Sequence, residues 1–191
     1  MATSPIVPST VKGLIFDCDG TLADTMPVHW HGWHMAFQAY GCTCPQSFLD
    51  ARAGIPTHLL LEEYNREFGG SIDLIGFRKA KDAHIDEALA RALPIEPVTA
   101  IAKQYHGTLP MAVASGGSFF HVEMILRAIG VLHLFDAIVT ADNKVAPKPS
   151  PEIFLEAARQ LGVPPADCLV FEDAPPGMAG ARAAGMLVID A

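Results

Sequence analysis

The chain has 191 residues, of which 50% are hydrophobic and 18% are charged, and this composition excludes a disordered protein. Its formal net charge of −8 disfavours nucleic acid and anionic membranes as partners, because phosphate groups are bound by basic surfaces. The first residues do not resemble a signal peptide, no apolar run approaches the ~20 residues that span a bilayer, and the four cysteines show no disulfide spacing. We therefore expect a compact, monomeric cytoplasmic protein with reduced thiols. A small anionic substrate is compatible with the negative net charge, because a binding site can be locally positive.

Residues 11–17 predict a buried strand that ends in carboxylates. Asp17 and Asp19 follow its apolar run directly, and Asp24 comes five residues later. Like charges this close repel one another and lose solvation when they are enclosed. The segment is therefore either an acidic turn or the edge of a site for a positive group, and we expect Asp24 to cap the helix that follows.

Residues 24–92 have the pattern of helices almost throughout. Trp30, Trp33 and Phe37 form an apolar stripe at helical spacing, and residues 75–93 are rich in good helix formers. No strand pattern occurs in this stretch. We therefore expect a helical insertion directly after the first strand.

The remainder of the chain alternates short apolar runs with amphipathic helices. The expected strands are 111–115, 135–142, 168–173 and 186–190, and the expected helices between them are 118–129, 151–161 and 175–184. Repeated units of this kind form a parallel sheet that is covered by helices on both faces. The sequence therefore predicts an α/β fold, with a Rossmann-like parallel sheet core from residues 1–23 and 93–191 and an inserted α-helical cap at 24–92.

Polar residues follow four of the predicted strands, at the sheet edge where open parallel sheets bind ligands. Carboxylates there suit Mg²⁺, whereas hydroxyl, amide and ammonium groups bind phosphate oxygens, and an aspartate can itself be the nucleophile in phosphoryl transfer. No histidine or cysteine lies at these positions, which disfavours zinc. The residues, in strand order, are Asp17 and Asp19; Ser115, Gly116 and Gly117; Lys144 and Lys148; and Glu172 and Asp173.

Four motifs together resemble the haloacid dehalogenase superfamily, and more narrowly its β-phosphoglucomutase-like sugar-phosphate phosphatases. They are DCDGT at 17–21, Ser115 after an apolar strand, Lys148 in PKPSPEIF, and EDAPPG at 172–177. The resemblance covers nearly the whole chain, and the motifs occur in the family's order. It implies a Mg²⁺-dependent phosphoric monoester hydrolase that acts on a small-molecule phosphate ester such as a fructose, glucose or gluconate phosphate.

The resemblance also implies catalytic roles for the matching residues. Asp17 attacks phosphorus and forms an aspartyl-phosphate, while Asp19 protonates the leaving oxygen and then activates water. Ser115 and Lys148, with Gly116, bind the phosphoryl group.

The same resemblance implies a magnesium site on three of the acidic residues. Its ligands are the Asp17 side chain, the Asp19 backbone carbonyl and Asp173, and Glu172 supports the site.

Two residues of the helical cap match positions of this family. The resemblance implies that His29 hydrogen-bonds near the acid/base aspartate and that Lys81 faces the substrate. Together with Gly54 and His58 they make a polar lid, and we expect these four residues to bind the substrate.

Two positions depart from the phosphoglucomutases of this family. Thr57 stands where their cap carries an arginine, and Ser118-Phe119 stands where they carry Lys-Asn. Both of those contacts hold the distal phosphate of a bisphosphate, so we favour hydrolysis over mutase activity. β-Phosphoglucomutase activity remains the alternative, and a non-catalytic phosphate sensor is disfavoured because Asp17 and Asp19 are both present.

Overall fold

A five-stranded parallel sheet forms the centre of one half of the molecule in the computed structural model, which describes residues 7–52 and 55–191. The strand order is β3-β2-β1-β4-β5, so β1 lies in the middle, between β2 and β4. The predicted fold class is therefore confirmed. The strands are β1 (Gly13–Phe16), β2 (Met111–Ala114), β3 (Ala137–Val139), β4 (Cys168–Glu172) and β5 (Leu187–Asp190).

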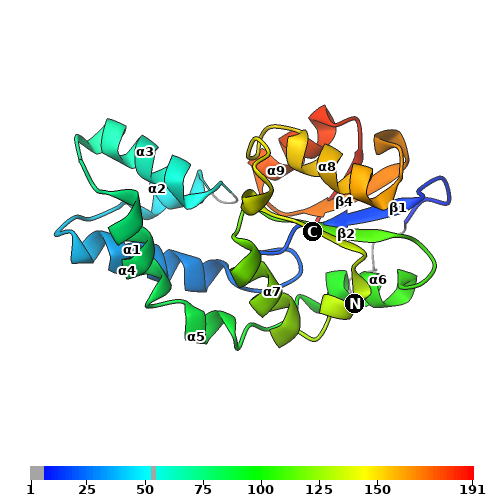
Figure 1. Ribbon diagram of the computed structural model, residues 1–191, viewed down its shortest axis with the longest axis horizontal. Helices are drawn as coiled ribbons and strands as arrows, with labels where there is room; N and C mark the ends of the chain where they lie inside the picture. The colour runs from blue at the N-terminus through cyan, green and yellow to red at the C-terminus, as the bar shows by residue number, and fades with distance from the viewer. Residues whose placement is uncertain (1–6, 53–54) are drawn as a thin grey trace.

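Two pairs of helices cover the two faces of the sheet (Figure 1). Leu14 and Phe16 of β1 pack with α6 (Glu96–Tyr105) and α7 (Phe119–Ala128) on one face. Ile15, between them, packs on the other face with α8 (Glu152–Leu161) and α9 (Pro175–Ala183), because successive strand residues point in opposite directions. Three short 3₁₀ helices complete this half: η1 (Leu132–Leu134), η2 (Ala141–Asn143) and η3 (Pro165–Asp167).

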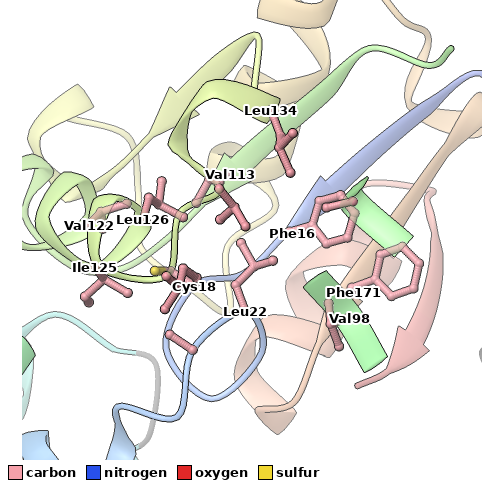
Figure 2. Close-up of a cluster of buried hydrophobic side chains, with 14 of the residues drawn as sticks. Phe16, Cys18, Leu22, Val98, Val113, Val122, Ile125, Leu126, Leu134 and Phe171 are labelled. Atoms are coloured by element: carbon pink, nitrogen blue, oxygen red, sulfur yellow. The ribbon is translucent and has the colours of Figure 1, made fainter. Parts of the chain in front are cut away.

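The buried cluster between β1, α6 and α7 anchors the loop that carries the first two aspartates (Figure 2). Phe16 stacks on Phe171 of β4 with ring centroids 4.8 Å apart. Cys18 and Leu22 are fully buried in the same cluster. Because the chain enters the core at residues 16, 18 and 22, the intervening Asp17 and Asp19 are held at the sheet edge.

Five helices between β1 and α6 form a second half, on the left of Figure 1. Helices α1 to α4 share an apolar cluster of their own that includes Trp33, Phe37 and Phe77. Ile85 and Leu89 instead pack into the cluster beneath the sheet. We propose that residues 24–92 form the cap, with its last helix packed against the core; the helices are α1 (Met26–Ala39), α2 (Gln46–Asp50), α3 (Thr57–Phe68), α4 (Leu74–Asp82) and α5 (Asp86–Leu89).

The two chain connections between these halves lie side by side. The Asp24 N–H donates to the Leu93 carbonyl at 3.0 Å, and the Ile95 N–H donates to the Leu22 carbonyl at 2.9 Å. Gly20, just before them, has φ of +88°, a conformation that glycine adopts without strain. The chain therefore leaves and re-enters the sheet half at one place.

Two local expectations are wrong. Asp24 is exposed and does not cap α1, whose N-cap residue is Thr25. The third strand ends at Val139 instead of 142, because Thr140 accepts the Asp142 N–H and begins a 3₁₀ turn. Within the described residues, no helix has the length and apolar character that crossing a membrane requires.

Candidate active site

The topology brings the ends of three neighbouring strands together. Asp17 follows β1, Ser115 follows β2 and Glu172 ends β4, and β2 and β4 are the two neighbours of β1. Lys148 reaches the same place from the loop between β3 and α8, and its Nζ lies 2.6 Å from Asp17 Oδ1 and 2.6 Å from Glu172 Oε2. All four side chains are buried. Sequence segments as far apart as β1 and β4 therefore form one charged cluster.

The charges of this cluster are mutually dependent. Burial, followed by the negative charge of Glu172, raises the pKa of Asp17 well above its ordinary value. Burial alone lowers the pKa of Lys148, but the charges of Asp17 and Glu172 outweigh burial and raise it. Lys148 is therefore a permanent cation that neutralises only part of the negative charge around it.

Three carboxylates form a group that suits a divalent cation. Oxygens of Asp17, Glu172 and Asp173 all lie within 4.8 Å of one another. Both Glu172 oxygens already have partners, because Oε2 accepts from Lys148 and Oε1 accepts the Ala174 N–H at 3.1 Å. Asp17 and Asp173 each use only one oxygen in the side-chain hydrogen bonds of the described residues. Hard oxygen donors of this kind fit Mg²⁺, and the remaining oxygens of Asp17 and Asp173 are the ones that could bind it, with Glu172 beside them.

Two glycines make room for these carboxylates. A Cβ on Gly20 would lie 2.4 Å from Asp173 Oδ2, and a Cβ on Gly177 would lie 2.1 Å from the Glu172 carboxylate. Both distances are shorter than any van der Waals contact. The glycines of the DCDGT and EDAPPG motifs are therefore required by packing at the site.

Asp19 is oriented by the first helix of the cap. Its Oδ1 accepts from Thr25 Oγ1 at 2.6 Å and lies 2.8 Å from His29 Nε2. Burial raises the pKa of Asp19, but the charge and hydrogen bond of His29, with the hydrogen bond of Thr25, outweigh burial and lower it below the ordinary value. These contacts therefore favour the carboxylate form of Asp19, which must take up a proton before it can act as an acid.

The turn after β2 supplies polar groups beside the nucleophile. Ser115 Oγ accepts the Gly117 N–H at 3.0 Å, which folds the turn back on itself. Ser115, Gly116 and Gly117 all line a pocket that contains Asp17 and Asp19. This is the placement that the sequence predicts for a phosphoryl-binding turn.

The cap closes over this pocket with His29, Thr57, Lys81 and Trp33. Lys81 is buried, with its Nζ 5.3 Å from the centre of the Trp33 ring. Burial lowers the pKa of Lys81, although Asp82 and Asp19 act in the opposite direction. The structure thus places His29 and Lys81, two of the predicted cap residues, next to the acidic centre.

The other two predicted cap residues are His58 and Gly54. His58 lines a neighbouring cavity together with Gly116 and Lys148, and Gly54 lies outside the described residues.

Sequence reasoning missed the hydroxyl groups that orient the carboxylates. Thr21 Oγ1 donates to Asp173 Oδ1 at 2.7 Å, and Thr25 donates to Asp19. Thr21 lies within the DCDGT motif, so the sequence could have indicated its role. Nothing in the sequence indicates the hydrogen bond of Thr25 except its position before a helix.

The fold and this site agree with a comparison to protein families. The model for haloacid dehalogenase-like hydrolases matches residues 11–185. The chain therefore belongs to the haloacid dehalogenase-like hydrolases. The predicted family is confirmed, and so is the predicted class of enzyme, a phosphatase.

Two phosphatases and one solved hydrolase structure are similar to the chain over most of its length. The chain is 36% identical to the fructose-1-phosphate phosphatase YqaB of Escherichia coli, over 93% of this chain and 95% of that protein. It is 28% identical to the validoxylamine A 7′-phosphate phosphatase of Streptomyces hygroscopicus, over 93% of this chain and 84% of that protein. A hydrolase structure from Pseudomonas syringae matches with a TM-score of 0.82 at 25% identity, over 93% of this chain and 83% of that one.

Proposed function

We propose that the chain is a Mg²⁺-dependent phosphatase that hydrolyses small sugar phosphates through an aspartyl-phosphate on Asp17. The observation that carries the proposal is the pairing of two differently held carboxylates at one pocket. Asp17 is fixed by Lys148 on the sheet side, and Asp19 is fixed by His29 and Thr25 on the cap side. Two carboxylates with separate environments can take separate roles in one reaction.

In the first half of the reaction, a carboxylate oxygen of Asp17 attacks phosphorus. The bond between phosphorus and the sugar oxygen breaks, and Asp19 gives its proton to that oxygen, so the sugar leaves as a neutral alcohol. Ser115 Oγ, the Gly116 N–H and Lys148 Nζ are placed to bind the transferred phosphoryl oxygens. Their positive groups offset the repulsion between the Asp17 carboxylate and the incoming anion.

In the second half, Asp19 takes a proton from water, and the water oxygen attacks the phosphorus of the aspartyl-phosphate. The bond between Asp17 and phosphorus breaks, which releases inorganic phosphate and restores the Asp17 carboxylate, while Asp19 keeps the proton that it gives to the next leaving group. The lowered pKa of Asp19 favours the carboxylate that this step uses as a base.

Asp17, the Asp19 backbone carbonyl and Asp173 are the proposed ligands of Mg²⁺. When bound, the ion supplies charge neutralisation at the phosphoryl oxygens and lowers the pKa of the Asp17 carboxyl group. Glu172 keeps Lys148 in place beside that site.

For the substrate, we propose the monophosphate of a small sugar, with fructose 1-phosphate as the first compound to test. The support is the relative that carries this activity in its name, which is 36% identical over 93% of the chain. His29, Thr57 and Lys81 line the pocket next to Asp19, where the hydroxyl groups of a leaving sugar would lie.

The test is phosphate release by purified protein with Mg²⁺ from a panel of sugar monophosphates, beside an Asp17→Asn variant. We expect release from at least one hexose phosphate and a loss of at least about 1,000-fold in the variant, because an amide cannot form the acyl-phosphate. No release from any member of the panel, or equal rates for both proteins, would contradict the proposal.

Hydrolysis is preferred over β-phosphoglucomutase activity because Thr57 lines the pocket where an arginine would hold a distal phosphate. Incubation with β-glucose 1-phosphate and a glucose bisphosphate primer separates the two activities. We expect free phosphate; accumulation of glucose 6-phosphate would show that the mutase is correct.

A further inference from the structure

A histidine on α7 joins the cap to the sheet half at a point away from the two chain connections. His121 Nε2 lies 3.0 Å from Asp86 Oδ1, at the start of α5, and its Nδ1 lies 3.2 Å from Ser118 Oγ. The His121 side chain is only 12% exposed, whereas that of Asp86 is 48% exposed. The neutral ring with its proton on Nε2 satisfies both contacts: it donates to Asp86 and accepts from Ser118.

On the sheet side, this histidine is attached to the turn that follows β2. Ser118 caps α7 by accepting the His121 N–H, and it comes directly after Ser115, Gly116 and Gly117. The turn is fixed further by the Ala141 N–H, which donates to the Gly117 carbonyl at 3.1 Å. His121 is thus part of a rigid network around the predicted phosphoryl-binding turn.

On the cap side, Asp86 directly follows residues 81–85, which pack tightly against α1. A Cβ on Gly32 would lie 2.2 Å from the Ile85 side chain and 3.3 Å from Lys81 Cγ. Because Gly32 of α1 lies directly against the side chains of Ile85 and Lys81, a movement of residues 81–85 must also move α1. Lys81 belongs to this segment and His29 to α1, so both depend on the position of Asp86.

The contact also lies beside the reaction pocket. His121 and Ser118 line a cavity that also contains Asp19, His29 and Lys81. A change in the distance between α5 and α7 would therefore alter the space next to the acid/base aspartate.

We propose that His121 is a positioning residue, which holds Asp86 and thereby sets His29 and Lys81 at their working distance from Asp19. The inference rests on the proposed function, because it assigns a role in a reaction that uses Asp19. His121 itself touches neither phosphorus nor the leaving oxygen in this role.

The experiment compares Asp86→Ala, which removes the acceptor for His121 Nε2–H, with Glu87→Ala as a matched control. Glu87 is the next residue of α5, but it is exposed and, among the described residues, its ion pair is with Arg91 of the cap, at 2.7 Å. Each variant is assayed with the preferred sugar monophosphate and with p-nitrophenyl phosphate. The second ester has a good leaving group, so its hydrolysis depends little on proton donation by Asp19.

For Asp86→Ala, we expect kcat/KM for the sugar phosphate to fall about 10- to 100-fold, since small misplacement of catalytic groups has effects of this size. For p-nitrophenyl phosphate we expect a fall of less than about threefold, because proton donation matters little there. Glu87→Ala should match the wild type on both substrates. Equal losses of Asp86→Ala on both substrates, or no loss on either, would overturn the positioning role.

His121→Gln provides a second line of evidence, because glutamine can still donate a hydrogen bond toward Asp86. We expect a smaller loss than in His121→Ala, and no further loss when His121→Ala is combined with Asp86→Ala. Additive losses in the double variant would contradict the proposal. Failure of the wild-type protein to act on sugar phosphates, with p-nitrophenyl phosphate still hydrolysed, would instead count against the proposed substrate.

Discussion

The two sides of the pocket are built in different ways. On the sheet side, Asp17, Lys148 and Glu172 are buried and are joined by two contacts of 2.6 Å. On the cap side, His29 and Lys81 lie on two different helices, α1 and α4, and their placement depends on how those helices pack. The sheet therefore fixes the groups that we propose for phosphoryl transfer, whereas side-chain contacts within the cap set the groups that we propose to meet the leaving sugar.

The largest expected effect is on the sheet side. Lys148→Met leaves Asp17 and Glu172 buried without their cation, so we expect kcat to fall at least about 100- to 1,000-fold. The free energy of unfolding should also fall by about 3–5 kcal/mol, because an ion pair loses one buried partner.

Steady-state kinetics and thermal melting measure both changes. Lys144→Met is the matched control, because Lys144 is exposed in the same loop. A kcat close to that of the wild type in Lys148→Met would contradict the proposed role.

Metal removal tests the acidic cluster itself. EDTA should abolish turnover, and addition of Mg²⁺ to the metal-free protein should raise its melting temperature, because a ligand that binds only the folded state stabilises it. Asp173→Asn should largely remove that Mg²⁺-dependent shift. If the melting temperature of this variant responds to Mg²⁺ as the wild type does, then Asp173 is not a ligand.

A smaller effect is expected on the cap side. Thr25→Val removes one hydrogen bond to Asp19 but preserves the shape of the side chain. We expect kcat/KM for the sugar phosphate to fall about 10-fold or less, and the free energy of unfolding to fall by about 1 kcal/mol, a common value for one hydrogen bond. A loss as large as that of Lys148→Met would remove the distinction between the two sides.

Most of the sheet side could be predicted from the sequence because its residues lie next to a strand; Lys148, in the loop between β3 and α8, is the exception. Asp17, Ser115 and Glu172 end or follow apolar runs, and parallel strands bring their carboxyl ends to one edge. Their site roles remain predictions, but their convergence is observed.

The cap side was less accessible to prediction. Thr25 bonds to Asp19, whereas Asp24, the stronger capping candidate by residue type, is exposed. The helix-forming stretch 75–93 breaks at residues 83–85, where Ile85 turns into the core. Such details depend on tertiary packing between short helices, which local periodicity does not encode.

The two adjacent chain connections allow the inserted helical segment to vary. Backbone hydrogen bonds at Asp24 and Ile95 tie the chain leaving β1 to the chain returning to α6. The segment between them is a closed loop, and closure entropy rises only slowly with loop length. A longer, shorter or differently sequenced insertion can therefore replace this one, provided that it still fills the places of Ile85 and Leu89 in the cluster beneath the sheet. The choice of sugar can change independently of the chemistry performed on its phosphate.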